Sequence, residues 1–252
     1  MENLVDVKNI SMTYHAKSGE TQAIHDVSFA VREGEFISVV GPSGCGKSTL
    51  LSIISGLVKA SSGEVFFGGE KVVSPSGKIG YMLQKDHLFE WRNIWDNVNL
   101  GLEIQGKKDP DYAMSLVKKY GLYDFRKSAP SQLSGGMRQR AALIRTLAVR
   151  PALLLLDEPF SALDYQTRLA VSDEVGEIIK RENKTAILVT HDISEAISLS
   201  DRVIVLSKRP SEVKTVHDII LSVSERSAVK SREAPEFREY FNMIWKELDV
   251  HA

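Results

Sequence analysis

Short runs of alternating apolar and polar residues fill the chain up to about residue 36, with polar turns between them. An alternation of period two predicts strands with one buried face, and these are expected to pair in antiparallel order. A short, mainly apolar run follows at 36–40, then a glycine-rich loop and a segment at 48–57 that is expected to be helical. Strand-like runs return at 63–72 and 79–83. The pattern predicts an antiparallel β subdomain followed by a strand–loop–helix unit.

Helical spacing replaces the strand pattern between about residues 85 and 148. Beyond this region, apolar strand-like runs at 153–157, 185–192 and 202–208 alternate with helical segments. This alternation implies a parallel sheet with helices on its faces. We therefore predict an α/β fold with a mostly parallel sheet and an inserted α-helical lobe at about 85–148.

One domain, 1–252, is expected to hold these elements, with the α/β core and β subdomain at about 1–84 and 149–210. A C-terminal strand and helix extension follows at about 211–252. Its last helix is predicted to begin at Pro235, because proline is favoured in a first helical turn. The apolar residues of this helix share one face, which favours packing onto the domain over membrane contact. They are Phe237, Phe241, Ile244 and Leu248.

Composition restricts the compartment and the partners. The 252 residues are 43% hydrophobic and 26% charged, with a net charge of -1, so no basic excess points to nucleic acid. Cys45 is the single cysteine, which excludes an intramolecular disulfide and favours a reducing compartment. The N-terminus lacks the pattern of a signal peptide, and the longest aliphatic run, 152–156, is too short to span a bilayer. We expect a cytoplasmic protein that reaches a membrane only through partners.

The loop at 41–49 reads GPSGCGKST and contains the pattern G-x-x-x-x-G-K-[ST] between an apolar strand and a predicted helix. This context is typical of the P-loop NTPase core, in which backbone N–H groups surround phosphate oxygens. Lys47 is expected to reach the terminal phosphates, Ser48 to ligate Mg²⁺, and Cys45 to pack as a small side chain. The predicted phosphate-binding residues are Gly41, Pro42, Ser43, Gly44, Cys45, Gly46, Lys47, Ser48 and Thr49.

Polar residues follow three of the predicted core strands. Asp157 and Glu158 end one strand, His191 ends the next, and Gln84 follows a third. Ligands of open parallel sheets bind beyond the carboxyl ends of the strands. We expect Asp157 to hold a metal, Glu158 to accept a proton from water, His191 to contact phosphate or orient Glu158, and Gln84 to offer an amide oxygen to metal or water.

A second Ser-Gly-Gly turn, in LSGGMRQR at 133–140, opens a predicted helix far from the first glycine loop. Such a turn also suits an anion. Tyr14 ends the first strand-like segment and offers a flat face to a purine, although taken alone an aromatic residue there is more often a packing residue.

The order of GPSGCGKS, Gln84, LSGGM, LLLLDEP, SALD at 161–164 and His191 resembles the ATP-binding cassette (ABC) ATPases, from Tyr14 to His191. The resemblance implies that Tyr14 stacks on adenine, that Ser48, Gln84 and Asp157 hold Mg²⁺, and that Glu158 is the general base. His191 would be the switch histidine, and Asp164 would lie at a dimer seam. In this family two cassettes pack head to tail, so that the turn of one chain caps the ATP of the other. The residues of that turn are Leu133, Ser134, Gly135, Gly136 and Met137.

The stretch at 88–98 resembles the importer ATPases for nitrate, sulfonate and taurine, although Glu90 replaces a common proline and Ile94 a valine. That branch implies permease subunits, a solute-binding protein and a position on the inner face of the cell membrane. Phe89, Trp91 and Trp95 are candidates for the permease contact, with ordinary packing inside the lobe as the alternative for each of them and above all for Trp95.

Other ABC functions remain open at this point: an exporter ATPase, or a soluble ABC ATPase not linked to transport. DNA-repair relatives carry long coiled coils before LSGGM, for which this chain has no room, and ribosome-acting relatives carry two cassettes. A non-hydrolysing regulatory module would not need Glu158 and His191.

Overall fold

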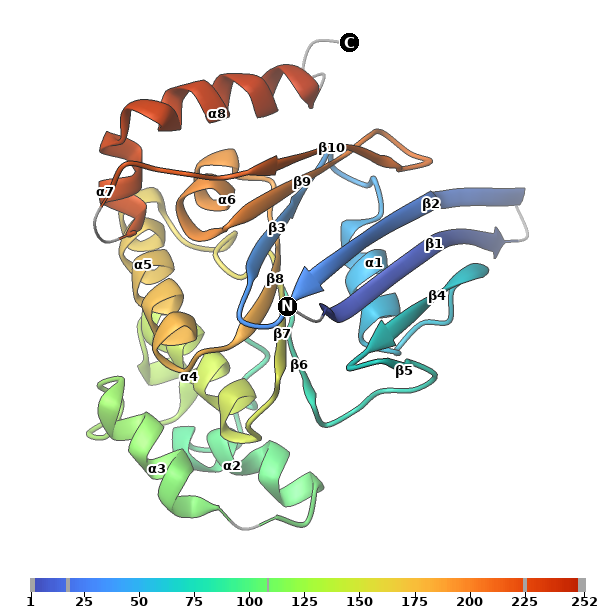
Figure 1. The fold of residues 1–252 in the computed structure, drawn as a ribbon. Helices are drawn as coiled ribbons and strands as arrows, with labels where there is room; N and C mark the ends of the chain where they lie inside the picture. The colour runs from blue at the N-terminus through green and yellow to red at the C-terminus, as the bar shows by residue number, and fades with distance from the viewer. Residues whose placement is uncertain (1–2, 17–18, 108, 224–225, 249–252) are drawn as a thin grey trace.

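The chain folds around two β-sheets, described by a computed structural model over residues 3–16, 19–107, 109–223 and 226–248 (Figure 1). The larger sheet has the strand order β10-β9-β3-β8-β7-β6, in which only β10 runs antiparallel to its neighbour. The expected α/β core with a mostly parallel sheet is confirmed. The six strands are β3 (Phe36–Val40), β6 (Ile79–Met82), β7 (Leu153–Asp157), β8 (Thr185–Val189), β9 (Arg202–Leu206) and β10 (Val213–Asp218).

The second sheet is antiparallel, with the order β2-β1-β4-β5. Where the sequence suggests short strands, β1 and β2 run for 14 residues each. A register shift between Val7 and Ile10 explains the difference, because it keeps both side chains on the buried face although the alternation breaks at Asn9. The strands are β1 (Asn3–Ala16), β2 (Gly19–Arg32), β4 (Ser62–Phe67) and β5 (Glu70–Lys71).

Both faces of the large sheet are covered, which explains why strand β7 is apolar at successive positions. Leu154 and Leu156 join a core with the helices that lie between β6 and β7, while Leu153 and Leu155 join a core with α1 and the second sheet. The inserted helical lobe is therefore confirmed as helices that share one core with the sheet. These helices are α2 (Ile94–Ile104), α3 (Pro110–Lys119), the 3₁₀ turn η1 (Pro130–Gln132) and α4 (Gly135–Ala148); α1 (Lys47–Ile54), α5 (Tyr165–Arg181) and α6 (Ile193–Leu199) belong to the core.

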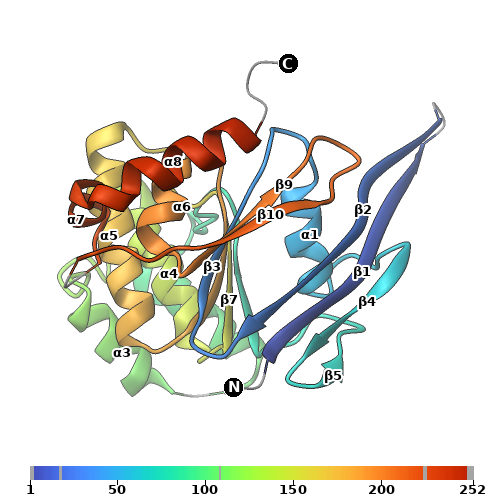
Figure 2. The same ribbon diagram turned by 45° about the horizontal axis from the view of Figure 1, so that its top comes forward.

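The C-terminal helices α7 (Ala228–Glu233) and α8 (Pro235–Glu247) close the described chain. Figure 2 shows α8 lying across α6 beside β9. Ile244 is fully buried against Ile197 and Val205, and the other predicted stripe residues of α8 pack at the same cluster. The packing role predicted for this helix is confirmed. Within the described ranges, no helix is both long and apolar enough to cross a membrane.

Candidate functional site

The glycine loop at 41–49 joins β3 to α1 and is shaped by close backbone packing. Gly46 has a φ of 107°, a conformation that L side chains rarely adopt. A Cβ on Gly41 would lie 2.8 Å from Cys45 Sγ and 3.1 Å from Leu206 Cβ. Lys47 is almost fully buried, and its ammonium donates to the carbonyl oxygens of Gly41 at 2.8 Å and Pro42 at 3.0 Å. The loop therefore wraps around a cation at the N-terminus of a helix, which is an arrangement suited to phosphate.

Cys45 lies inside this loop as a packing residue. Its side chain is buried in the core that α1 shares with the second sheet. Burial raises the pKa of the thiol, which keeps it protonated and unreactive. This agrees with the expected role of a small packing side chain.

Asp157 connects the end of β7 to the glycine loop. One oxygen of its carboxylate accepts a hydrogen bond from Ser48 Oγ at 2.9 Å, and the other accepts one from Tyr81 OH at 3.4 Å. Burial raises the pKa of Asp157, although the bond from Ser48 opposes this effect. Two residues that are 109 positions apart in sequence are thus brought together as predicted, and Tyr81 joins them.

Glu158, Gln84 and His191 meet at the carboxyl ends of three strands. Glu158 Oε2 lies 3.1 Å from His191 Nδ1 and accepts a bond of 3.3 Å from Gln84 Nε2. Glu158 has a φ of 45°, and its backbone N–H donates to Val189 O at 2.8 Å. Positive φ in a residue with a side chain is uncommon and concentrates at functional sites. The structure therefore brings together three of the four residues that were predicted at this edge, and Asp157 directly precedes Glu158 in the sequence.

Three residues of the site carry oxygen atoms that could hold a cation. Ser48 offers a hydroxyl, Asp157 a buried carboxylate and Gln84 a side-chain amide. Mg²⁺ prefers oxygen ligands and is held in nucleotide sites by one or two protein groups together with phosphate oxygens. A bound cation would also favour the ionised form of Asp157, which burial disfavours. These residues fit a Mg²⁺ site.

Tyr14 lies at the end of β1, close to the start of α1. Its hydroxyl is 3.0 Å from Thr49 Oγ1, and 43% of the residue is exposed. The ring is therefore available beside the last residue of the glycine loop. Stacking on a purine stays a prediction.

The second glycine turn, 133–137, begins helix α4. Ser134 caps this helix, because its Oγ accepts a hydrogen bond from Met137 N at 3.3 Å. A Cβ on Gly135 would lie 2.9 Å from Leu163 Cδ2, and one on Gly136 would lie 2.7 Å from Val171 Cγ2. Both glycines thus let α4 approach the 161–164 segment and α5. Ser134 is exposed, and the unpaired backbone N–H groups of the first turn of α4 follow directly after it.

Asp164 caps the next helix in the same way. Its carboxylate accepts a bond from Thr167 N at 3.1 Å, and hydrogen bonding from Thr167 lowers the pKa of this exposed side chain. Ser161, three residues before it, accepts a bond of 3.4 Å from Gln84 Nε2 and donates to Glu158 O at 3.0 Å. The sequence interpretation did not single out Ser161 or Tyr81. The sequence signal that could have identified them is their position: Ser161 follows the acidic end of one strand, and Tyr81 lies on a neighbouring strand.

A cavity of about 520 Å³ lies beside the glycine loop and His191, and residues Phe241 and Trp245 of α8 form another part of its wall. The loop and the histidine are therefore reachable from one side of the molecule.

Comparison with known proteins agrees with this geometry. The family model described as ABC transporter matches residues 24–161. The uncharacterized ABC transporter ATP-binding protein YtlC of Bacillus subtilis is 46% identical over 98% of this chain and 96% of its own length. The taurine import ATP-binding protein TauB of Roseobacter denitrificans is 39% identical over 96% of this chain and 94% of its own length.

A solved structure shares the fold. The ATP-binding cassette MJ0796, determined as a dimer in a post-hydrolysis state with ADP and Pi, superposes with a TM-score of 0.74. It is 32% identical, and the match covers 86% of this chain and 99% of that one. With the nucleotide loop, the acidic strand end and the second glycine turn all in place, this chain belongs to the ABC transporter family of ATP-binding proteins and is an ATPase.

Proposed function

We propose that this chain is the ATP-hydrolysing subunit of an ABC importer for a small organic solute. The observation that carries the proposal is the meeting of Glu158 with His191, at 3.1 Å, and with Gln84, at 3.3 Å, next to the Ser48–Asp157 pair. A regulatory module that only binds nucleotide would have no use for a carboxylate held in this position.

The residues divide the reaction between them. The backbone of 41–49 and the ammonium of Lys47 bind the ATP phosphates. Glu158 Oε2 takes the proton of the attacking water, and His191 orients that carboxylate through its ring nitrogen. Ser48, Gln84 and Asp157 would hold Mg²⁺, which neutralises phosphate charge when bound.

A second copy of the chain would complete each site. The N-terminus of α4, with Ser134 exposed, would cap the γ-phosphate held by the partner, and Asp164 would lie at the seam between the copies. The related cassette MJ0796 was solved as a dimer, which supports this arrangement. ATP would then hold two copies together until it is hydrolysed.

We assign the contact with a permease to the surface formed by Phe89 and Trp91, which precede α2 in the chain. The rings of Phe89 and Trp91 stack with centroids 4.7 Å apart, and 79% of Trp91 is exposed. Trp95 instead packs against the core of the helical lobe, so we remove it from the contact. The TauB relative is a taurine import protein, which supports a sulfonate, taurine or nitrate-like solute, a solute-binding protein and a place on the inner face of the cell membrane.

Affinity purification from native membranes tests the importer proposal. The tagged chain should retain permease subunits, and Trp91→Ala should lower their recovery while ATP hydrolysis by the isolated chain stays unchanged. Val73→Ala, at another exposed apolar residue, is the matched control and should retain the permease. Recovery of the parental chain without any permease would contradict the proposal.

A further inference from the structure

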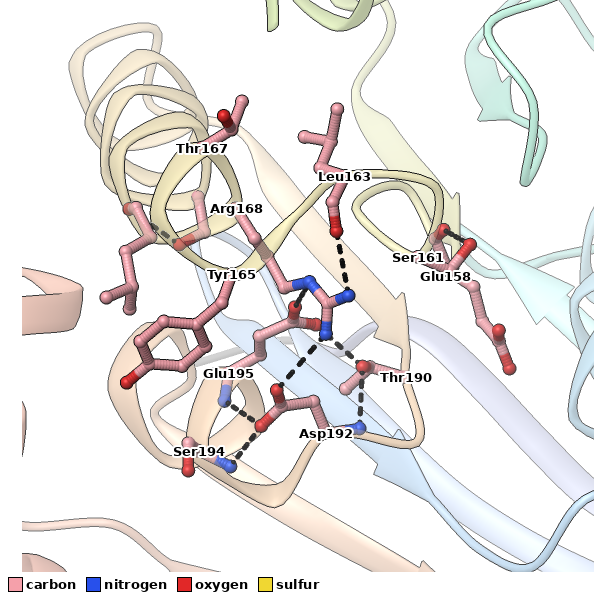
Figure 3. Close-up of polar contacts among 12 residues, drawn as sticks. Glu158, Ser161, Leu163, Tyr165, Thr167, Arg168, Thr190, Asp192, Ser194 and Glu195 are labelled. Atoms are coloured by element: carbon pink, nitrogen blue, oxygen red, sulfur yellow. Dashed lines mark hydrogen bonds and ion pairs between the residues drawn. The ribbon is translucent and has the colours of Figure 1, made fainter. Parts of the chain in front are cut away.

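Arg168, near the start of α5, contacts two segments of the proposed catalytic site (Figure 3). Its Nη2 donates to Leu163 O at 2.9 Å and so holds the 161–164 segment, which carries Asp164. Its Nη1 lies 3.7 Å from Asp192 Oδ2, directly after His191. One guanidinium therefore joins the predicted dimer seam to the segment at 190–192.

Glu195 lies beside Arg168 and holds the same segment through Thr190. It is 5% exposed, and its Oε2 accepts a hydrogen bond of 2.7 Å from Thr190 Oγ1. The same Thr190 oxygen accepts a bond of 3.0 Å from Asp192 N. The backbone on both sides of His191 is thus tied to a single buried carboxylate.

The link between Arg168 and Glu195 is incomplete. Arg168 Nε and Glu195 Oε1 are 3.9 Å apart, and neither atom has a hydrogen-bond partner among the described residues although both are buried. A charge-assisted hydrogen bond would form if the two atoms approached by about 1 Å. This pair therefore gains a hydrogen bond from a small displacement of either side chain.

We propose that Arg168 is a positioning residue that couples the 161–164 segment to His191. When a second copy displaces Asp164, Arg168 closes onto Glu195 and moves the segment at 190–192, which sets the His191–Glu158 contact for catalysis. The inference rests on the proposed ATPase dimer and deepens it, because it assigns the path by which one chain senses its partner. Arg168 itself touches neither water nor phosphate in this scheme.

Steady-state kinetics of three variants test the coupling. Arg168→Leu should lower kcat about tenfold, the size of one coupling free energy between sites, and should reduce the cooperativity in ATP concentration. The dissociation constant of ATP for the separate chains and the Tm should change little. Arg168→Lys should recover part of kcat, because it keeps the charge but lacks the fork that reaches both segments. Adding Glu195→Gln to Arg168→Leu should cause no further loss, since the second change removes a charge whose partner the first has already removed.

Arg181→Leu is the control, because this arginine lies on the same helix but pairs with Glu177 at the surface, 2.7 Å away. It should keep the parental kcat. An Arg168→Leu variant with the parental kcat and the parental cooperativity would overturn the coupling. A parallel fall of kcat, ATP binding and Tm in this variant would overturn it too, and so would additive losses of kcat in the double variant. If Arg168→Leu fails to fold, the isosteric Glu195→Gln replaces it and should also lower kcat, because it removes the charge that draws Arg168 toward the segment at 190–192. Failure of the proposed function is recognised separately, because the parental chain and Arg181→Leu would then both lack ATP hydrolysis.

Discussion

Glu158 leaves strand β7 in a left-handed backbone conformation, which turns its carboxylate toward His191 and Gln84. Asp157, one residue earlier, points instead to Ser48 of the glycine loop. The positive φ of Glu158 thus makes two carboxylates that are adjacent in sequence face different partners. In the proposed function, this separation would let Asp157 support a metal while Glu158 accepts a proton.

Glu158→Gln is predicted to retain ATP binding and to lose ATP hydrolysis by about a hundredfold or more, because an amide cannot serve as the general base. A phosphate-release assay and a binding titration with labelled ATP measure the two properties. Glu177→Gln, an exposed carboxylate on α5, serves as the control and should hydrolyse at the parental rate. Hydrolysis by Glu158→Gln close to that rate would assign the base elsewhere.

Glu195 gives the folded chain a dependence on pH. Burial raises the pKa of Glu195 to about 7, reinforced by Asp192 and opposed by Thr190 and Arg168. The folded state therefore holds this proton more tightly than the unfolded state does. The stability that the protonated carboxyl contributes is complete below about pH 4.5 and is lost as pH rises through 7, by about 3 kcal/mol at most.

Glu195→Gln cannot ionise, so its free energy of unfolding should fall less than that of the parental chain between pH 5 and pH 8. Urea unfolding at both pH values measures the difference. Identical pH dependence in the two proteins would show that Glu195 keeps an ordinary pKa in the folded chain.

Sequence reasoning identified the site residues that follow strands, since the carboxyl ends of parallel strands share one edge of the sheet. Asp157, Glu158, His191 and Gln84 were all predicted on this ground. Arg168 and Glu195 were not, because their contact depends on how α5 packs beside α6. No periodicity or motif spacing in a single sequence determines that packing.

At the scale of elements, helix α4 owes its position to the two glycines of the 133–137 turn. Any side chain at Gly136 would collide with Val171 of α5. The N-terminus of α4 is therefore held against the element that begins at Asp164 and Tyr165. The exposed turn and the predicted seam belong to one surface for this reason.

Ser134→Arg should abolish most ATP hydrolysis while ATP binding to the separate chain changes less than about twofold. The bulky cation fills the space that the partner's phosphate would take, and loss of the cap itself costs only about 1 kcal/mol. Ser227→Arg removes the equivalent cap of α7, whose Ser227 Oγ accepts from Lys230 N, and should remain active. An equal loss of binding and hydrolysis in Ser134→Arg would contradict a site shared by two chains.

Most helices and strands were predictable from the periodic spacing of hydrophobic residues, and the exceptions have local causes. The apolar run 153–157 became β7 because both of its faces are buried. Strands β1 and β2 were longer than predicted, since a bulge near Asn9 restores the inward face where the alternation of the sequence breaks. The division of the domain at residues 84/85 and 148/149 stays a prediction, because the lobe and the sheet share one core.

At the scale of the whole molecule, the chain has two glycine turns suited to phosphate. The loop 41–49 joins β3 to α1, whereas the turn 133–137 packs onto α5 and exposes Ser134. If two copies pack head to tail, each bound nucleotide would contact the loop 41–49 of one chain and the turn 133–137 of the other. Each chain would then contribute half of each of two sites, and dimer closure would be the step that couples ATP to transport.

The molar mass of Glu158→Gln in solution tests this claim most directly. Light scattering should give the mass of one chain without nucleotide and of two chains with MgATP, because ATP binds but is not hydrolysed. The double variant Glu158→Gln/Ser134→Arg should keep the mass of one chain under both conditions. A Glu158→Gln protein that binds MgATP and still has the mass of one chain would contradict the shared site.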